Sequence, residues 1–229
     1  MYQAGLLDQI VMIWHRELRS SFPDSNLISQ CLFTVSTILR HFPLAQKAFF
    51  GPLANESSPV GFSLLYHTLR IKPTSGKLKA RLFSLLGDLL AEQNITGSKK
   101  EQKKSDQCEL YVPTNLVADL PKYGFCQAAI STLFDPDLTD DTSNRQRIMG
   151  AILHISRICS PSEMFPHKPE VKRRKVRKFF DKWIRETRKE AEEEAKENMR
   201  FGMNYYDELL RLLENASYSI LRLPETKQV

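Results

Sequence analysis

Residues 32–49 read LFTVSTILRHFPLAQKAF, and this stretch predicts a helix, a sharp stop and a second helix. Apolar side chains recur every three or four residues before Pro43, which is the period of an amphipathic helix. Proline cannot continue a helix because it lacks a backbone N–H, but it favours the first position of the next one. We therefore expect a helix from a cap at Asp24 or Ser25 through about residue 42, followed by a short helix ending at Phe50.

The same apolar period recurs along most of the chain and predicts an all-α protein. Hydrophobic residues make up 41% of the 229 residues and glycine is scarce at 9, which favours helices joined by short loops. Residues 93–108 read as a polar, lysine-rich loop. The further helices that we expect span residues 6–18, 60–70, 76–92, 114–120, 122–134, 142–159, 169–200 and 203–222.

Three strongly apolar helical segments, residues 32–39, 82–90 and 148–155, resemble one another at spacings of about 50 and 65 residues. In an armadillo-like helical repeat solenoid, these segments would stack as buried inner helices beside a concave face. The alternative is an irregular helical bundle. On the solenoid interpretation, residues 1–160 form the repeats, residues 161–202 a charged helical segment, and residues 203–229 the last helix and a tail.

The chain carries a formal net charge of +6, most of it near the basic run Lys172–Lys178. Such a run is found in nuclear-import and nucleic-acid-binding segments. It is also typical of a solvated helix face, and the acidic residues that follow favour this second interpretation. No aromatic side chains alternate with the basic ones as a stacking platform would require, so we expect no nucleic-acid partner.

Signatures of catalysis are absent from the sequence. The five histidines form no metal-binding pair at helical spacing, and the glycine-rich and serine motifs of common enzymes do not occur. We therefore expect neither an enzyme nor a bound metal or cofactor. There is also no run of about 18 apolar residues, so we expect no membrane span.

Glycosylation sequons and cysteines bear on the cellular compartment. Sequons begin at Asn55, Asn94 and Asn215, the first two in predicted loops or at a helix end and the third on a predicted helix. Cys126 and Cys159 lie on neighbouring predicted helices and could pair in an oxidising compartment. The alternative is two small buried side chains.

The opening stretch resembles the Sil-type nucleotide exchange factors of the chaperone BiP, whose members carry a near-identical L-R-H-F-P-x-A-Q run after an apolar helix. Leu82–Glu92 resembles the next family helix, and Gly124-Phe125-Cys126 is similar to a family Gly-Trp-Cys. Residues 204–210, NYYDELL, are similar to a closing Gly-Tyr-Phe-x-Glu-Leu-Leu, and Cys159 matches a family cysteine. The charged segment at 169–200 has no counterpart that we recognise.

The resemblance implies an armadillo-like co-chaperone, the C-terminal part of such a factor, that promotes ADP release from BiP in the lumen of the endoplasmic reticulum. It would grip lobe II of the nucleotide-binding domain and assist protein translocation and folding. A signal peptide would precede such a protein, and this chain does not begin with one. We expect a monomer.

Helical phase, rather than the resemblance, selects the candidate contact residues. Polar side chains beside the apolar stripes of the inner helices would face the groove of a solenoid. The residues chosen in this way are Arg40, His41, Lys47, Lys79, Asp88 and Glu92.

Two other functions fit the sequence. One is an exchange factor of the same armadillo type that acts on a cytosolic heat-shock ATPase. The other is a nuclear or nucleic-acid-binding helical adaptor that uses Lys172–Lys178, whose affinity would fall steeply as salt rises.

Overall fold

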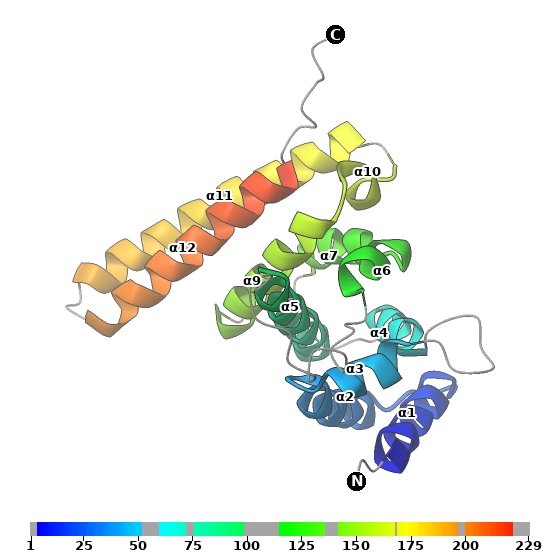
Figure 1. Ribbon diagram of the computed structural model, residues 1–229. Coiled ribbons are helices and arrows are strands. Elements are labelled where there is room, and N and C mark those ends of the chain that lie inside the picture. The colour runs from blue at the N-terminus through cyan, green and yellow to red at the C-terminus, as the bar shows by residue number, and fades with distance from the viewer. Residues whose placement is uncertain are drawn as a thin grey trace. The chain divides into compact units, whose positions relative to one another are not determined.

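The computed structural model describes residues 4–51, 60–71, 76–98, 115–135, 142–167, 169–196 and 200–221. These residues form eleven helices and no strand, so the prediction of an all-α chain is confirmed (Figure 1). None of the described helices combines the length and apolar character that a membrane crossing requires. The helices are α1 (Ala4–Leu18), α2 (Ser25–Leu39), α3 (Pro43–Phe50), α4 (Val60–Arg70), α5 (Gly76–Ser98), α6 (Leu116–Lys122), α7 (Phe125–Thr132), α9 (Thr142–Ile158), α10 (Pro161–Met164), α11 (Pro169–Lys196) and α12 (Arg200–Leu221).

Several helix ends differ from the predictions by a few residues, and one helix was not predicted. Helix α2 begins after the Asp24 cap, whose carboxylate accepts the N–H groups of Asn26 and Leu27, but it ends at Leu39 rather than near 42. Helix α5 continues to Ser98, so the first six residues of the predicted loop 93–108 are helical. The short helix α10 was not predicted, although its capping box at Ser160 is readable in the sequence.

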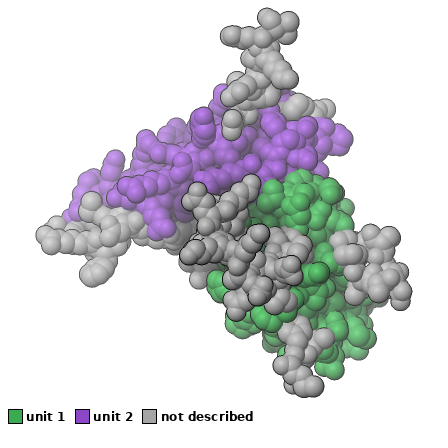
Figure 2. All heavy atoms as spheres, viewed as in Figure 1, with its two compact units in different colours: residues 1–125 green, residues 126–229 purple. Residues whose placement is uncertain are grey.

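The chain divides into two compact units, residues 1–125 and residues 126–229 (Figure 2). The sequence-based division at residues 160 and 202 is different. The charged helix α11 and the last helix α12 pack against each other, and α12 also packs on α9, so all three helices belong to the second unit. The reason is that α11 buries an apolar stripe, and the charged composition of the segment hides this stripe.

A run of aromatic rings forms the core of the first unit. Trp14 of α1 stacks at a centroid distance of 6.3 Å on Phe49 of α3, which meets Phe50 edge to face. Phe50 in turn contacts Phe62 of α4, and Phe62 stacks on Tyr123 at 4.6 Å. Because buried aromatic side chains bring a large hydrophobic contribution and favour these geometries, this run holds four helices together.

Two close approaches tighten this core. Gly61 at the start of α4 lies so near α3 that a Cβ atom would meet the carbonyl oxygen and the ring of Phe49. The buried indole Nε1–H of Trp14 donates a 3.0 Å hydrogen bond to Thr68 Oγ1, which satisfies the polar atom of that ring.

The second unit is built on a helical hairpin. Helices α11 and α12 lie side by side in Figure 1, and Arg188 pairs with Glu214 across them at 2.8 Å. Val176, Phe180 and Trp183 of α11 are buried, which places one face of this charged helix in the core.

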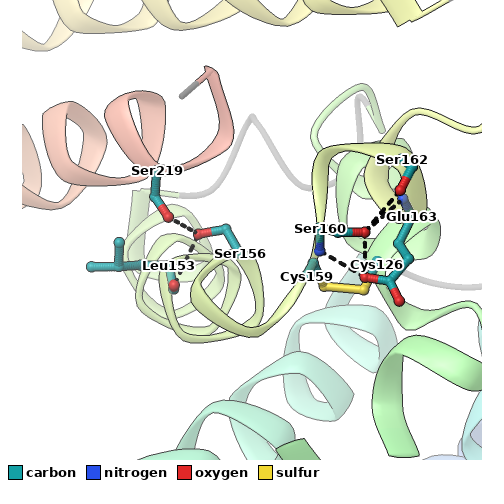
Figure 3. Close-up of a disulfide and its surroundings, with 8 residues drawn as sticks. All are labelled: Cys126, Leu153, Ser156, Cys159, Ser160, Ser162, Glu163 and Ser219. Carbon is teal, nitrogen blue, oxygen red and sulfur yellow. Dashed lines mark hydrogen bonds between the residues drawn. A yellow bond between two sulfur atoms is a disulfide. The ribbon is translucent and has the colours of Figure 1, made fainter. Parts of the chain in front are cut away.

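A disulfide joins α7 to the end of α9 in the second unit. The sulfur atoms of Cys126 and Cys159 are bonded, and the bond closes a loop over a sequence separation of 33 residues (Figure 3). Directly after Cys159, the backbone N–H of Ser160 donates to the Glu163 carboxylate and the N–H of Glu163 donates to Ser160 Oγ. The capping box therefore fixes the chain direction at the end of the cross-link.

We predict that this cross-link stabilises the protein against unfolding. Replacing both cysteines, in Cys126→Ser/Cys159→Ser, should lower the free energy of unfolding by about 2–4 kcal/mol, because the bond restricts the unfolded chain. Urea denaturation followed by circular dichroism measures the change. Dithiothreitol should lower the urea midpoint of the parent protein and leave that of the double variant unchanged. An identical midpoint for parent and variant under oxidising conditions would contradict the prediction.

Candidate functional site

The reversal between α2 and α3 is the most unusual piece of backbone in the first unit. Arg40 caps α2 in an extended conformation, with φ of −62° and ψ of 130°. His41 follows at a φ of +60°, in the left-handed region that a residue with a Cβ rarely adopts. Pro43 then occupies the first turn of α3, as its fixed φ favours. A left-handed non-glycine residue costs on the order of 1–3 kcal/mol and persists only where its surroundings hold it in place.

Glu92 of α5 supplies those surroundings. Its carboxylate accepts the backbone N–H of His41 at 3.2 Å and lies 3.2 Å from His41 Nδ1. It also accepts Gln46 Nε2 at 3.0 Å, and the same nitrogen donates to the carbonyl oxygen of Leu39 at 3.0 Å. One carboxylate therefore ties the end of α2 and the start of α3 to α5.

Arg40 and Asp88 form a second link between α2 and α5. The Nε and Nη2 atoms of Arg40 lie 2.9 and 2.8 Å from Asp88 Oδ2. Arg40 Nη1 also reaches Ser36 Oγ at 3.4 Å, within its own helix. A guanidinium held by several contacts is more firmly oriented than the ammonium of a lysine would be.

The hydrogen bonds and the ion pair between α2 and α5 show the relative direction of the two helices. Near the start of α2, Arg81 Nη1 donates to Ser29 Oγ at 2.6 Å. Near its end, Arg40 pairs with Asp88. Because positions on both helices increase together, α2 and α5 run in the same direction where they pack.

These links create a mixed surface that we call the α2–α5 surface, made of Ser29, Phe33, Arg40, His41, Arg81, Asp88 and Glu92. Much of it faces solvent. The side chains of Arg40 and Asp88 are 32% and 48% exposed, and that of His41 is 85% exposed. Phe33, which follows Ser29 by one helical turn on α2, is 59% exposed. The surface therefore presents oriented charges beside one aromatic ring, a composition typical of protein recognition.

The structure brings together four of the six contact residues that the sequence suggested. Arg40, His41, Asp88 and Glu92 lie in the network described above. Lys79 is half-buried on α5, off the stripe that carries Asp88 and Glu92. Lys47 is exposed on α3, and its ammonium group pairs with no described residue.

Gln46, Phe33 and Arg81 were missed as candidate residues. Gln46 is buried in the quoted run, and its amide is hydrogen-bonded as buried polar groups usually are, but nothing in the local sequence marks it as buried. Phe33 lies in the strongly apolar segment 32–39, and its side-chain type gives no sign that this position faces solvent.

The sequons fall in three different settings. Asn55 lies outside the described residues. Asn94 lies in the last part of α5, so the expectation of a loop at this position is wrong. Asn215 is exposed on α12, next to the Glu214 that pairs with Arg188.

The structure also describes one cysteine that is not part of the disulfide. This cysteine is Cys31 of α2, which is buried, whereas Cys108 lies outside the described residues. Burial, with the nearby Glu17 carboxylate as a lesser cause, raises the pKa of the Cys31 thiol. A thiol with a raised pKa carries less thiolate at neutral pH and exchanges slowly with disulfides.

We predict that Glu92 is a principal support of the α2–α3 reversal. Glu92→Ala should lower the free energy of unfolding by about 1–3 kcal/mol, because it removes the acceptor of the His41 N–H and one of the two acceptors of the buried Gln46 amide. The neighbouring variant Lys47→Ala should change it by no more than about 0.5 kcal/mol. Chemical denaturation of the two variants in parallel measures the difference, and equal effects would contradict the assigned role.

Comparison with known proteins gives the chain its family. A family model described as the SIL1/FES1/HPBP1 C-terminal domain matches residues 2–220. No curated protein and no solved structure matches the chain significantly. The matched region includes the α2–α5 surface, the disulfide and the helical hairpin. Because the family model covers nearly the whole chain, this protein belongs to the SIL1/FES1/HPBP1 family of Hsp70 nucleotide exchange factors.

Proposed function

We propose that this chain promotes ADP release from BiP, the Hsp70 of the endoplasmic reticulum, by binding lobe II of its nucleotide-binding domain through the α2–α5 surface. The main support for the proposal is a network of hydrogen bonds and ion pairs on the protein surface. It pairs Arg40 with Asp88 and His41 with Glu92, and so holds these side chains in place. The family supplies the general activity, and this network supplies a candidate contact surface.

Pre-organisation is the physical property that suits this surface to the task. Side chains that are already ordered lose little conformational entropy when a partner binds, so more of the interaction energy remains as affinity. Arg40 is fixed by Asp88 and Ser36, and the backbone at His41 is fixed by Glu92. Phe33 offers an apolar anchor among these polar groups, as the centre of many interfaces does.

We further propose that α2 and α5 are the inner helices of successive armadillo-like repeats. Equivalent helices of neighbouring repeats run in the same direction and each contacts the next. The paired positions of α2 and α5 support this arrangement, because residues 29 and 40 meet residues 81 and 88 in the same order. In such a stack the α2–α5 surface would lie on the concave face.

Exchange requires no bond chemistry from this chain. A partner can shift a conformational equilibrium only by as much as it prefers one state, so the chain must bind the open ATPase cleft more tightly than the closed one. The coupling is reciprocal: if the chain lowers the affinity for ADP by a given factor, ADP lowers the affinity for the chain by the same factor. A rigid surface favours such discrimination because it cannot adapt equally well to both conformers.

The proposed compartment has its own support. Disulfides persist in oxidising compartments and are rare in the cytosol, and Cys126 is bonded to Cys159. The exposed Asn215 is accessible for glycan attachment. A cytosolic member of the same family would not need either feature.

The direct test is release of labelled ADP from purified BiP, and from a cytosolic Hsp70 in parallel, with and without this chain. We expect the release rate to rise with the concentration of the chain for BiP and to rise less for the cytosolic protein. If the chain accelerated ADP release from the cytosolic Hsp70 alone, its partner would be a cytosolic Hsp70 rather than BiP. No acceleration of either would remove the exchange function from this chain.

Swapping the charges of Arg40 on α2 and Asp88 on α5 distinguishes a role of this pair in partner binding from a role in stabilising the fold. Arg40→Asp and Asp88→Arg should each destabilise the fold, whereas the double variant can restore the ion pair in reverse. We predict that the double variant regains most of the thermal stability but accelerates ADP release about tenfold less than the parent, since a partner would meet reversed charges. Lys196→Glu on α11 is the charge-reversal control. Full recovery of exchange in the double variant would reduce the pair to a structural role.

A further inference from the structure

The outward face of α11 carries a concentration of positive charge that the exchange function does not use. Residues 170–185 contain eight lysines or arginines and two acidic residues, so this segment alone matches the net charge of +6 of the whole chain. Its apolar side chains, Val176, Phe180 and Trp183, are buried in the second unit. Six of the eight basic residues are exposed, whereas Lys172 and Arg173 are half-buried.

Four of these cations form what we call the α11 basic patch: Arg174, Lys175, Arg177 and Lys178. All four are exposed, and none forms an ion pair with any part of the chain that the structure describes. The second half of the same helix is different, because Lys182 pairs with Glu186, Lys189 with Glu193, and Arg188 with Glu214 of α12. An ordinary solvated helix face would show such pairs along its whole length.

The geometry of the patch limits what can bind to it. From Arg174 to Arg185 the helix rises by about 16 Å, and basic side chains one turn apart lie about 6 Å from each other. Acidic side chains, Glu190, Glu192 and Glu193, occupy the next two turns of the same straight helix. A partner must therefore be strongly anionic over a short length and must end, or change sign, where the acidic half begins.

Neither a membrane nor a nucleic acid meets this condition well. A helix that binds a membrane inserts an apolar face, and the apolar face of α11 is already buried. A flat anionic membrane would also meet the acidic half of the helix. A nucleic acid presents an unbroken row of phosphates, which the exposed Asp181 within the basic segment would repel, and no aromatic residue alternates with the basic side chains of residues 172–178 as a stacking platform would require.

We propose that the α11 basic patch binds a short acidic polypeptide segment of a partner protein. Carboxylates spaced three or four residues apart on a partner helix would lie opposite Arg174 and Lys178, and further carboxylates could reach Lys175 and Arg177. A short polypeptide segment can end before Glu190, which a long continuous polyanion cannot do. This site is separate from the α2–α5 surface, which lies in the other unit.

Fluorescence anisotropy with an oligoglutamate peptide of about twelve residues, the length of the basic segment, tests the proposal. Binding to the intact chain should be measurable at low salt and should weaken as ionic strength rises, since the Debye length falls to about 10 Å at 0.1 M. The variant Arg174→Gln/Lys178→Gln should reduce the affinity about two- to tenfold, as expected for the loss of two surface ion pairs. The matched control, Lys189→Gln/Lys196→Gln, removes equal charge from the acidic half of the same helix and should have little effect.

Several outcomes would overturn the proposal. Equal weakening in the two variants would mean that net charge, rather than the patch, determines binding. Tighter binding of a single-stranded RNA, or of vesicles containing phosphatidylserine, that depends on Arg174 and Lys178 would assign the patch to another class of partner. Absence of oligoglutamate binding by a chain that still accelerates ADP release would reject the site and leave the exchange function intact.

Discussion

The left-handed turn at His41 is the constraint on which the first unit depends. A side chain at a φ of +60° is unfavourable by itself, yet the turn lets the chain leave α2 and enter α3 within a few residues. Glu92 makes this possible from about fifty positions away, because its carboxylate accepts both the His41 N–H and the Gln46 amide. The contacts of Glu92 therefore link the turn to the position of α5.

The same contacts explain why the candidate functional surface coincides with a structural network. Arg40 and Asp88 hold α2 beside α5, and they do so at the surface rather than in the core. Exposed ion pairs contribute little to stability, with typical values of about 0–1 kcal/mol, so stability alone is a weak reason for this arrangement. Oriented charges with an exposed Phe33 beside them are more useful for recognition of a partner. The first unit thus uses one set of residues both to set the direction of its helices and to present a contact surface.

The helices were largely predictable from the sequence, and their ends and contacts were less so. Apolar periodicity located the helices because each buries one stripe, and Pro43 marked the start of α3 correctly. Helix α2 ends earlier than predicted because Glu92 of the distant helix α5 accepts the His41 N–H and stabilises the turn. The local sequence of α2 does not reveal this contact. Similarly, the charged composition of α11 concealed the buried Val176 and Phe180, which join it to the second unit. Helical phase selected the candidate residues Arg40, Asp88 and Glu92, which the structure brings together. It also selected Lys79, which lies off the stripe that carries Asp88 and Glu92, and it gave no sign that Phe33 faces solvent.

The central claim is that an Hsp70 nucleotide-binding domain contacts the α2–α5 surface. Hydrogen–deuterium exchange of the chain, measured by mass spectrometry with and without a nucleotide-free Hsp70, tests it most directly. The account predicts slower exchange in the peptides that span residues 29–46 and 77–92, with ADP reversing the effect. Protection confined to α11 and α12, with residues 29–46 and 77–92 unchanged in a complex that still releases ADP faster, would contradict it.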